Sequence, residues 1–220
     1  MQTPKLQNVG IISVIISDKP ENIDDFNKNP YPDQTILTPY WLIAKNRTME
    51  LKNKKIAAVI HEIFEDLELW YPVIRLREAG AEVVLAGEKA GKQYTGKHGL
   101  PASADVSYDD LNADEFDGLI IPGGYAPDKM RRYPKVLEFV KQINDAGKPI
   151  GIICHAGWVT VSAGILKGRK ATSVGAIKDD MINAGANWVD EPVVTDKNLV
   201  SSRTPADLPD YMKAYLALLD

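Results

Sequence analysis

The sequence predicts a three-layer α/β domain built on a mostly parallel β-sheet. From Lys54 onwards, short apolar segments alternate with longer amphipathic segments, and a glycine closes several of the longer ones. Strands that alternate with helices are typical of a parallel sheet covered on both faces. In such sheets the functional residues gather at the carboxyl ends of the strands. Three predicted strand ends carry chemically reactive residues, which predicts that they share one site.

The predicted strands and helices follow one another in regular order. Ile56–Ile60 predicts the first strand, and Leu67–Ala79 predicts a helix that ends at Gly80. Residues 87–108 contain several glycines, which indicates short strands and turns. The other predicted strands are Glu82–Ala86, Asp117–Ile121, Pro149–Ile153, Asn187–Thr195 and Leu199–Ser202. The other predicted helices are Pro134–Ala146, His155–Ala163, Ile177–Ala184 and Pro205–Leu219.

The first 50 residues differ in composition from the rest of the chain. They are rich in proline, asparagine and aspartate; only Val9–Ser17 resembles a strand, and Leu37–Ala44 is apolar enough to pack on another surface. We therefore predict an N-terminal extension over residues 1–50, partly ordered by packing on the main domain or on a neighbouring subunit, and one domain over residues 51–220. A disordered leader or a wrongly assigned start site is the alternative.

The overall composition is that of an ordinary soluble globular protein. The chain has 220 residues, of which 45% are hydrophobic and 25% charged, and its formal net charge of -4 gives no reason to expect a nucleic acid or an anionic membrane as a partner. One cysteine excludes an intramolecular disulfide and suits a reducing cytosol, so we expect a cytoplasmic protein. No group of histidines and cysteines has zinc-ligand spacing, so we expect neither metal nor cofactor.

The single cysteine, Cys154, follows the predicted strand Pro149–Ile153 and precedes the predicted helix His155–Ala163. A thiol at such a junction lies over free backbone N–H groups and the positive end of a helix dipole, and both favour the thiolate. A lone cysteine is more often a small buried apolar residue. Its place at a strand end, with a histidine beside it, favours a nucleophile here.

Residues at the other two strand ends predict partners for the thiol. Gly123 and Gly124 follow the strand Asp117–Ile121 and allow a close approach of the backbone. Their N–H groups, together with that of His155, predict an oxyanion hole. Glu65 begins a helix, where a carboxylate stabilises the helix dipole. Alternatively, it reaches the thiol as a protonated carboxyl group that shuttles a proton.

The roles of four further side chains stay open. His155 is adjacent to Cys154 in the chain, and adjacent side chains do not normally face one another. We therefore expect the His155 ring to point toward a partner chain or a carboxylate, of which Asp128 is the nearest candidate, although Asp128 also suits a helix cap. Tyr125 either packs or walls the pocket. Arg203 either binds an anionic group or bridges to carboxylates.

A series of sequence motifs supports this site. The chain resembles the ThiJ/PfpI superfamily, and within it the PfpI-type intracellular proteases, from about Leu51 to the C-terminus. The resemblance rests on motifs that occur in family order: Phe64–Glu68, Gly96–Gly99, Glu115–Leu119, Pro122–Asp128, Ile153–His155, Leu166–Thr172, Ile177–Asp180, Asn183–Gly185 and Ser201–Arg203. Two features depart from the family pattern: the extension 1–50, and Ala156-Gly157-Trp158 in place of the commoner Gly-Pro after Cys-His.

The resemblance implies a flavodoxin-like sheet with Cys154 on a nucleophile elbow. It implies that Cys154 is the nucleophile, that Glu65 touches its thiol, and that Gly124 and His155 supply the backbone oxyanion donors. Asp128 falls where PfpI-type proteins bring a carboxylate to the histidine of a neighbouring subunit, and it is one methylene shorter than a glutamate there. Family members form dimers, and PfpI-type members form trimers paired into hexamers, so we expect a homo-oligomer.

The resemblance also implies three kinds of function. The first is glutathione-independent glyoxalase or deglycase chemistry on a small aldehyde or a glycated adduct, in which Cys154 forms a hemithioacetal and Glu65 moves a proton. The second is peptidase or amidase action on a peptide, with His155 as the base. The third is non-enzymatic: a stress chaperone or a redox sensor that acts through Cys154. We favour aldehyde chemistry because it demands only a thiolate and one proton shuttle. A glutamine amidotransferase is disfavoured because no histidine follows His155 in the chain.

Overall fold

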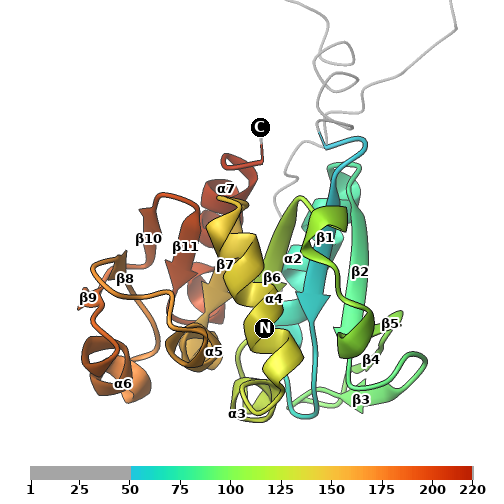
Figure 1. Ribbon diagram of the computed structural model, residues 1–220, viewed down its shortest axis with the longest axis horizontal. Helices are drawn as coiled ribbons and strands as arrows, with labels where there is room; N and C mark the ends of the chain where they lie inside the picture. Colours follow the sequence, from blue (N-terminus) through green and yellow to red (C-terminus); the bar gives the residue numbers. More distant parts are fainter. Residues whose placement is uncertain (1–50, 220) are drawn as a thin grey trace, which may run out of the picture. The chain divides into compact units, whose positions relative to one another are not determined.

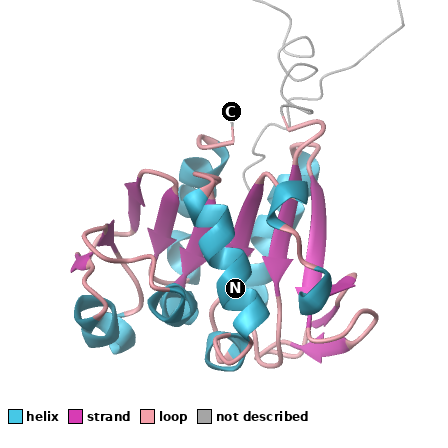
Figure 2. Cartoon of the chain, viewed as in Figure 1, coloured by secondary structure: helices cyan, strands magenta, loops and turns pink. Residues whose placement is uncertain are grey.

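The computed structural model describes residues 51–219, and the predicted extension over residues 1–50 lies outside the described residues. Within the described part, a sheet of seven strands runs through the middle, with helices on both faces (Figures 1 and 2). The strand order is β10-β11-β7-β6-β1-β2-β5. Every pairing in this sheet is parallel except that of β10 with β11. The predicted α/β fold with a mostly parallel sheet is therefore confirmed.

The strands of the main sheet are β1 (Lys55–Val59), β2 (Glu82–Gly87), β5 (Val106–Ser107), β6 (Gly118–Ile121), β7 (Ile150–Ile153), β10 (Val193–Asp196) and β11 (Leu199–Ser202). Two small two-stranded sheets are formed by β3 (Gln93–Thr95) with β4 (Pro101–Ser103), and by β8 (Lys170–Ala171) with β9 (Asn187–Trp188). The helices are α2 (Asp66–Glu78), α3 (Ala126–Met130), α4 (Pro134–Asp145), α5 (Gly157–Ala163), α6 (Lys178–Asn183) and α7 (Leu208–Leu216).

The central strands are buried on both faces because helices cover both. All residues of β6 and β7 are buried, and these strands are rich in isoleucine, as expected for a parallel sheet between two helical layers. In Figure 1, α4 and α5 lie in front of the sheet, and α2 and α7 lie behind it. The helix α4 has its buried residues at positions 136, 139, 140 and 143, which is the spacing of one helical face. This packing holds the strand ends in place.

The strand order reverses direction at β1. The chain passes from β1 to β2 on one side and later returns to β6 on the other side of β1. At such a switch point the loops that leave two neighbouring strands diverge and create a crevice at their carboxyl ends. Here the loops after β1 and β6 are joined by an isolated antiparallel bridge between Phe64 and Gly124. The neighbouring strand, β7, leads directly into Cys154.

The structure differs from the sequence-based elements mainly where segments are short. The predicted strand Asn187–Thr195 is two strands, β9 and β10, which belong to different sheets. Residues Cys154–Ala156 form a 3-10 turn before α5 begins, and Pro205–Asp207 form another before α7. Both differences occur where proline or a backbone turn interrupts a helix start. In the described part of the chain, the helices all fall short of the length and apolar character needed to cross a membrane.

Candidate active site

The candidate active site lies at the carboxyl ends of β1, β6 and β7. A pocket of about 270 Å³ opens there, lined by Cys154, His155, Gly124 and Tyr125 together with residues from α2 and from the loop between β3 and β4. These residues come from distant parts of the sequence. This agrees with the expectation that the three strand ends share one site. The structure thus brings together Cys154, His155, Gly124, Tyr125 and Glu65 from the sequence-predicted set.

Cys154 occupies a strained turn between β7 and α5. Its φ angle is 59°, a left-handed conformation that a residue with a side chain rarely adopts. Such strain persists only where the surrounding structure holds it, and here buried β7 on one side and α5 on the other do so. The backbone N–H groups of Gly124 and His155 are directed at the sulfur and lower the pKa of the thiol. The predicted pair of backbone donors therefore faces the nucleophile.

The carboxyl group beside the thiol belongs to Glu68, not to Glu65. Glu68 is fully buried in the first turn of α2, and its Oε2 accepts the N–H of Gly123 at 2.9 Å. The thiol of Cys154 interacts with the Glu68 carboxyl and lowers the pKa of that group. The other carboxyl oxygen, Oε1, is buried without a hydrogen-bond partner in the described residues. The thiol contact predicted for Glu65 is thus made by the residue one helical turn further on.

Glu65 has the capping role that the sequence left as an alternative. Its Oε2 accepts the backbone N–H of Glu68 at 2.8 Å, and it is the N-cap residue of α2. Its Oε1 lies 3.7 Å from Nε2 of His98. The reason is geometric: the cap residue points its side chain back over the first turn, whereas a residue three positions later lies inside that turn and faces the sheet.

Burial dominates the electrostatics of the Cys154–Glu68 pair. Burial, followed by repulsion from Glu65, raises the pKa of Glu68 to about 8. Burial, followed by the charge of Glu68, raises the pKa of the Cys154 thiol to about 12. The sequence predicted a lowered thiol pKa, and that prediction is wrong in sign because desolvation and the carboxylate outweigh the two N–H donors. At neutral pH, Glu68 is predominantly protonated, and the repulsion that it exerts when ionised is then absent.

His155 faces the thiol even though it follows Cys154 directly. Its Nδ1 lies 3.2 Å from the sulfur of Cys154. The left-handed turn at Cys154 swings two adjacent side chains to the same side, which the sequence-based expectation did not allow for. The His155 ring also lies against the Trp158 ring, with centroids 5.0 Å apart. Burial, followed by the charge of Lys97, lowers the pKa of His155, so its imidazole is neutral at neutral pH.

The two glycines after β6 have different roles. The Gly123 N–H is occupied by Glu68, so it is not free to donate to an oxyanion as predicted. Gly124 has a φ of 75°, and a Cβ at this position would collide with the carbonyl of Ile63. A side chain is therefore excluded at Gly124, whose N–H remains directed at the sulfur. Tyr125, 65% exposed, forms part of the pocket wall, as one of its two predicted roles required.

A loop between β3 and β4 covers one side of the pocket and contributes Lys97 and His98. Asp66 holds this loop: its two carboxylate oxygens accept the backbone N–H groups of His98 at 2.7 Å and of Leu100 at 2.8 Å. The charge of Lys97 lowers the pKa of both His155 and Glu68. Lys97 and His98 are site residues that no sequence-based prediction named, although they stand in a motif that carried the family resemblance.

Asp128 and Arg203 do not line this pocket in the described chain. Asp128 lies in α3 and forms an ion pair with Arg132 at 2.5 Å. Its predicted contact with a histidine of a neighbouring subunit stays a prediction. The guanidinium of Arg203 is held by Asp207 and Asp190, with N–O distances of 2.8 to 3.2 Å. Arg203 therefore bridges carboxylates, which was the second of its two open roles, and does not line the pocket as a substrate-binding residue.

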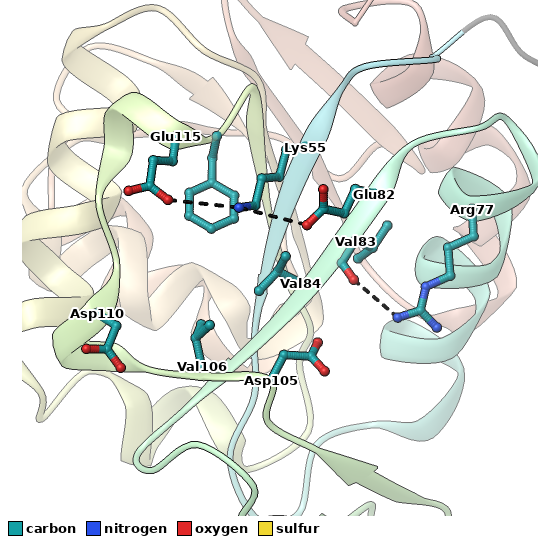
Figure 3. Close-up of a pocket in the computed structure, with 10 residues that line it drawn as sticks. Lys55, Arg77, Glu82, Val83, Val84, Asp105, Val106, Asp110 and Glu115 are labelled. Carbon is teal, nitrogen blue, oxygen red and sulfur yellow. Dashed lines mark hydrogen bonds and ion pairs between the residues drawn. The ribbon is translucent and has the colours of Figure 1, made fainter.

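A second hollow, of about 380 Å³, lies at the amino ends of β1 and β2 (Figure 3). Lys55 reaches between Glu82 and Glu115 there, at 3.8 and 3.9 Å, and Arg77 donates to the carbonyl of Val83 at 3.2 Å. Lys55, Glu82 and Glu115 thus hold one another and Arg77 holds β2, and no nucleophile lines this hollow. In residues 51–219, the histidine, cysteine and acidic side chains form no cluster of three or more that could hold a metal ion.

The comparisons with known proteins agree with this geometry. The model of the DJ-1/PfpI family matches residues 54–218. The chain belongs to the DJ-1/PfpI family. It is similar to the structure of Drosophila melanogaster DJ-1beta, with a TM-score of 0.70, 27% identity, and coverage of 76% of this chain and 90% of that chain. The flavodoxin-like fold and the resemblance to PfpI-type proteins are therefore both confirmed.

Relatives in this family bear the names of enzymes. The chain is 49% identical to the deglycase PfpI of Pyrococcus furiosus, over 71% of this chain and 93% of that protein. It is 42% identical to the protein/nucleic acid deglycase 2 of Escherichia coli, over 76% and 98%. It is also 42% identical to a Bacillus subtilis protein provisionally named cysteine protease YraA, over 76% and 99%. These names support an enzyme of the DJ-1/PfpI family.

A sequence signal could have identified Glu68. Positions 68, 72 and 76 are four residues apart and are all buried in α2, together with Leu69 and Val73. Glu68 therefore stands on the apolar face of the helix, where a carboxyl group is costly unless it has a specific partner. A glutamate on a buried helical face, next to a strand end that bears a nucleophile, is a stronger candidate than a glutamate at a cap.

Proposed function

We propose that this protein is a cysteine-dependent enzyme of the glyoxalase or deglycase type, which acts on small reactive aldehydes or their early adducts. One observation carries the proposal: the buried Glu68 carboxyl, with a pKa raised to about 8, lies beside a thiol that two backbone N–H groups face. The deglycase names of relatives support it. The pocket of about 270 Å³ suits a small substrate better than an extended chain.

The first step starts from the monoanion in which Cys154 is a thiolate and Glu68 holds the proton. The thiolate adds to the aldehyde carbon of methylglyoxal. A bond forms between sulfur and C1, and the carbonyl oxygen becomes a hydroxyl group by taking a proton from Glu68. The N–H groups of Gly124 and His155 are directed at the sulfur and thus lie near the oxygen that carries the developing charge. The product is a hemithioacetal, and Glu68 is left as a carboxylate.

The second step is a proton transfer between carbons. The Glu68 carboxylate takes the proton from C1, which gives an enediolate, and then returns it to C2 while the hydroxyl proton moves from the first oxygen to the second. Glu68 Oε1 has no hydrogen-bond partner in residues 51–219, so it is available for this transfer. The result is a lactoyl thioester of Cys154. Water hydrolyses the thioester and releases lactate and the free thiol.

The experiment that tests this proposal measures lactate formation from methylglyoxal. We expect activity in the wild type, none in Cys154→Ser, and a loss of about 100-fold or more in Glu68→Gln, which keeps the shape but not the proton transfer. Glu65→Gln is the matched control: it removes a neighbouring carboxylate in the same pocket, and we expect it to retain most of the activity. Equal losses in both glutamate variants, or lactate formation by Cys154→Ser, would contradict the assignment.

A second candidate function is peptide or amide hydrolysis through an acyl thioester. The specific observation in its favour is the 3.2 Å distance between Sγ of Cys154 and Nδ1 of His155, which suits a base beside a nucleophile. The cysteine protease name of one relative also favours it. Cleavage of casein or a fluorogenic peptide by the wild type, without lactate formation, would establish it. In that case, a loss of cleavage in Asp128→Asn would support a carboxylate from a neighbouring subunit.

A non-enzymatic role is the remaining alternative. A redox sensor needs only Cys154, whose sulfur is oxidised to sulfenic acid by peroxide, and makes no demand on Glu68. If neither methylglyoxal nor peptide is turned over while peroxide modifies Cys154 at low concentration, the aldehyde proposal fails. We propose a homo-oligomeric state from the family resemblance, and gel filtration of the full chain and of a variant that lacks residues 1–50 tests it.

A further inference from the structure

A small pocket of about 180 Å³, separate from the thiol site, lies at the end of β1 and beside α3. It is lined by His61, Lys129, Arg132 and Tyr133, none of which lines the Cys154 pocket. His61 follows β1 closely, and the other three belong to α3 or to the segment between α3 and α4. All four side chains carry at least one hydrogen-bond donor. Such a lining is suited to a ligand rich in acceptor atoms.

His61 is the buried member of the group. Its side chain is only 8% exposed, and its Nδ1 accepts the backbone N–H of Glu62 at 2.7 Å. The ring proton of the neutral imidazole is therefore on Nε2, and in residues 51–219 this atom has no hydrogen-bond partner. The ring is held between Tyr94 and Tyr133, at centroid distances of 5.4 and 5.9 Å. The ring is thus held in a fixed orientation, with an N–H group that no described protein group accepts.

The charges around the pocket leave one cation without a partner. In the described residues, no carboxylate lies within 4 Å of the Lys129 ammonium, while Arg132 pairs with Asp128. The other acidic groups near His61 are already engaged. Glu88 pairs with Lys92 at 2.6 Å, and Glu62 accepts the N–H of Thr95 at 2.9 Å.

We propose that this pocket binds a small oxyanion of the phosphate class. The Lys129 ammonium and the Nε2–H of His61 provide two donors. The guanidinium of Arg132, which pairs with Asp128, and the ring of Tyr133, whose hydroxyl interacts with Glu88, complete the lining. The volume is several times the roughly 30 Å³ that a water molecule occupies in the liquid, which leaves room for a phosphate group with a few further atoms. Tetrahedral oxyanions offer acceptor atoms in the several directions from which these donors approach.

The titration of His61 gives the proposal a direct readout. In the free protein, burial lowers the pKa of His61, and the charges of Lys129 and Lys92 lower it further, against the opposing charges of Glu88 and Glu62. A bound oxyanion adds negative charge next to Nε2. We therefore expect the ligand to raise the pKa of His61, and to bind more tightly as His61 becomes protonated.

The test is a titration of the full-length protein with inorganic phosphate, at constant ionic strength set by chloride. The ring signals of His61 in an NMR spectrum, assigned by their loss in His61→Gln, report binding. We expect a saturable shift, and a dissociation constant on the order of tenfold weaker in Lys129→Met, because a charge-assisted hydrogen bond is lost. Lys135→Met is the matched control: Lys135 pairs with Glu138 on the surface of α4, and its removal changes the net charge equally.

Titrations with other anions define the class of ligand that the pocket binds. Sulfate is expected to compete with phosphate because it has the same tetrahedral geometry, whereas acetate is expected to bind more weakly. Acetate that binds as tightly as phosphate would overturn the assignment to the phosphate class. A shift that never saturates, or that Lys129→Met and Lys135→Met reduce equally, would overturn the site itself. Because the readout is not catalysis, failure here is distinguishable from failure of the proposed function.

Discussion

The carboxyl group of Glu68 lies beside the thiol of Cys154, although one residue is on α2 and the other follows β7. Each group is buried. The charge of Glu68 raises the pKa of the Cys154 thiol, and the hydrogen bond from Cys154 lowers the pKa of Glu68. The two groups therefore titrate as a pair, and the pair exchanges protons with solvent in two steps. This relationship gives the site a proton that can be moved, and it leads to the predictions below.

Replacing Glu68 with glutamine lowers the pKa of the Cys154 thiol below its wild-type value of about 12. The carboxylate charge is removed, while the two backbone N–H donors stay in place. Thiolate absorbance in the ultraviolet, followed from pH 7 to 12, measures the change, with Cys154→Ser as the blank. A thiol pKa in Glu68→Gln that is equal to or above the wild-type value would show that burial alone controls the thiol.

The activity is expected to rise with pH, with an apparent pKa near 8. Loss of the first proton from the Cys154–Glu68 pair gives the monoanion, one form of which is a thiolate beside a protonated carboxyl. Lys97 favours this anion, so Lys97→Met shifts the rising limb of kcat/KM to higher pH. Lys89→Met removes the same charge from a residue outside this pocket and is expected to leave the limb in place. If the rising part of the pH profile does not move in Lys97→Met, the apparent pKa near 8 belongs to another group.

The contribution of Glu68 to the stability of the protein is expected to fall as the pH rises from about 5 to 8. Glu68 has a folded-state pKa of about 8 and an ordinary value of 4.5, so in this window the folded state binds the proton more tightly than the unfolded state. The associated stabilisation is complete below pH 4.5 and is lost as the pH rises toward 8.

Urea unfolding of the wild type and Glu68→Gln at several pH values tests this linkage. The difference in unfolding free energy between the two is expected to change with a slope of at most about 1.4 kcal/mol per pH unit. The wild type loses stability relative to Glu68→Gln as the pH rises. Parallel curves for the two proteins would mean that Glu68 titrates normally in the folded state.

A side chain at Gly124 is expected to damage both stability and activity. The residue has a φ of 75°, and an alanine Cβ would collide with the carbonyl of Ile63, next to the bridge that joins the two loops of the site. We expect Gly124→Ala to lower the free energy of unfolding by at least about 2 kcal/mol. Gly175→Ala is the control, because no atom lies within 4 Å of the added Cβ there. Equal stability of the two variants would contradict the strain at Gly124.

The helix α2 shows what can and cannot be predicted from the sequence. The spacing of apolar residues predicts the helix to within one residue at each end, because the pattern is local. Which glutamate meets the thiol depends on the rotation of that helix against the sheet. Both glutamates are buried, but Glu65 precedes the helix and caps it, whereas Glu68 lies inside its first turn and adjoins the thiol. The sequence-based assignment of Glu65 failed at this point.

By itself, the sequence determined the α/β layers, the strand ends that meet at one edge, and the place of Cys154 at a strand-to-helix junction. These features follow from the period and order of apolar segments. The tertiary structure decided that Glu68 and not Glu65 adjoins the thiol, that His155 faces it, and that Arg203 is held by aspartates. Those outcomes depend on the strained backbone angle at Cys154, on the packing of α2 and on side-chain contacts that form only in the folded chain. The order of apolar segments does not specify them.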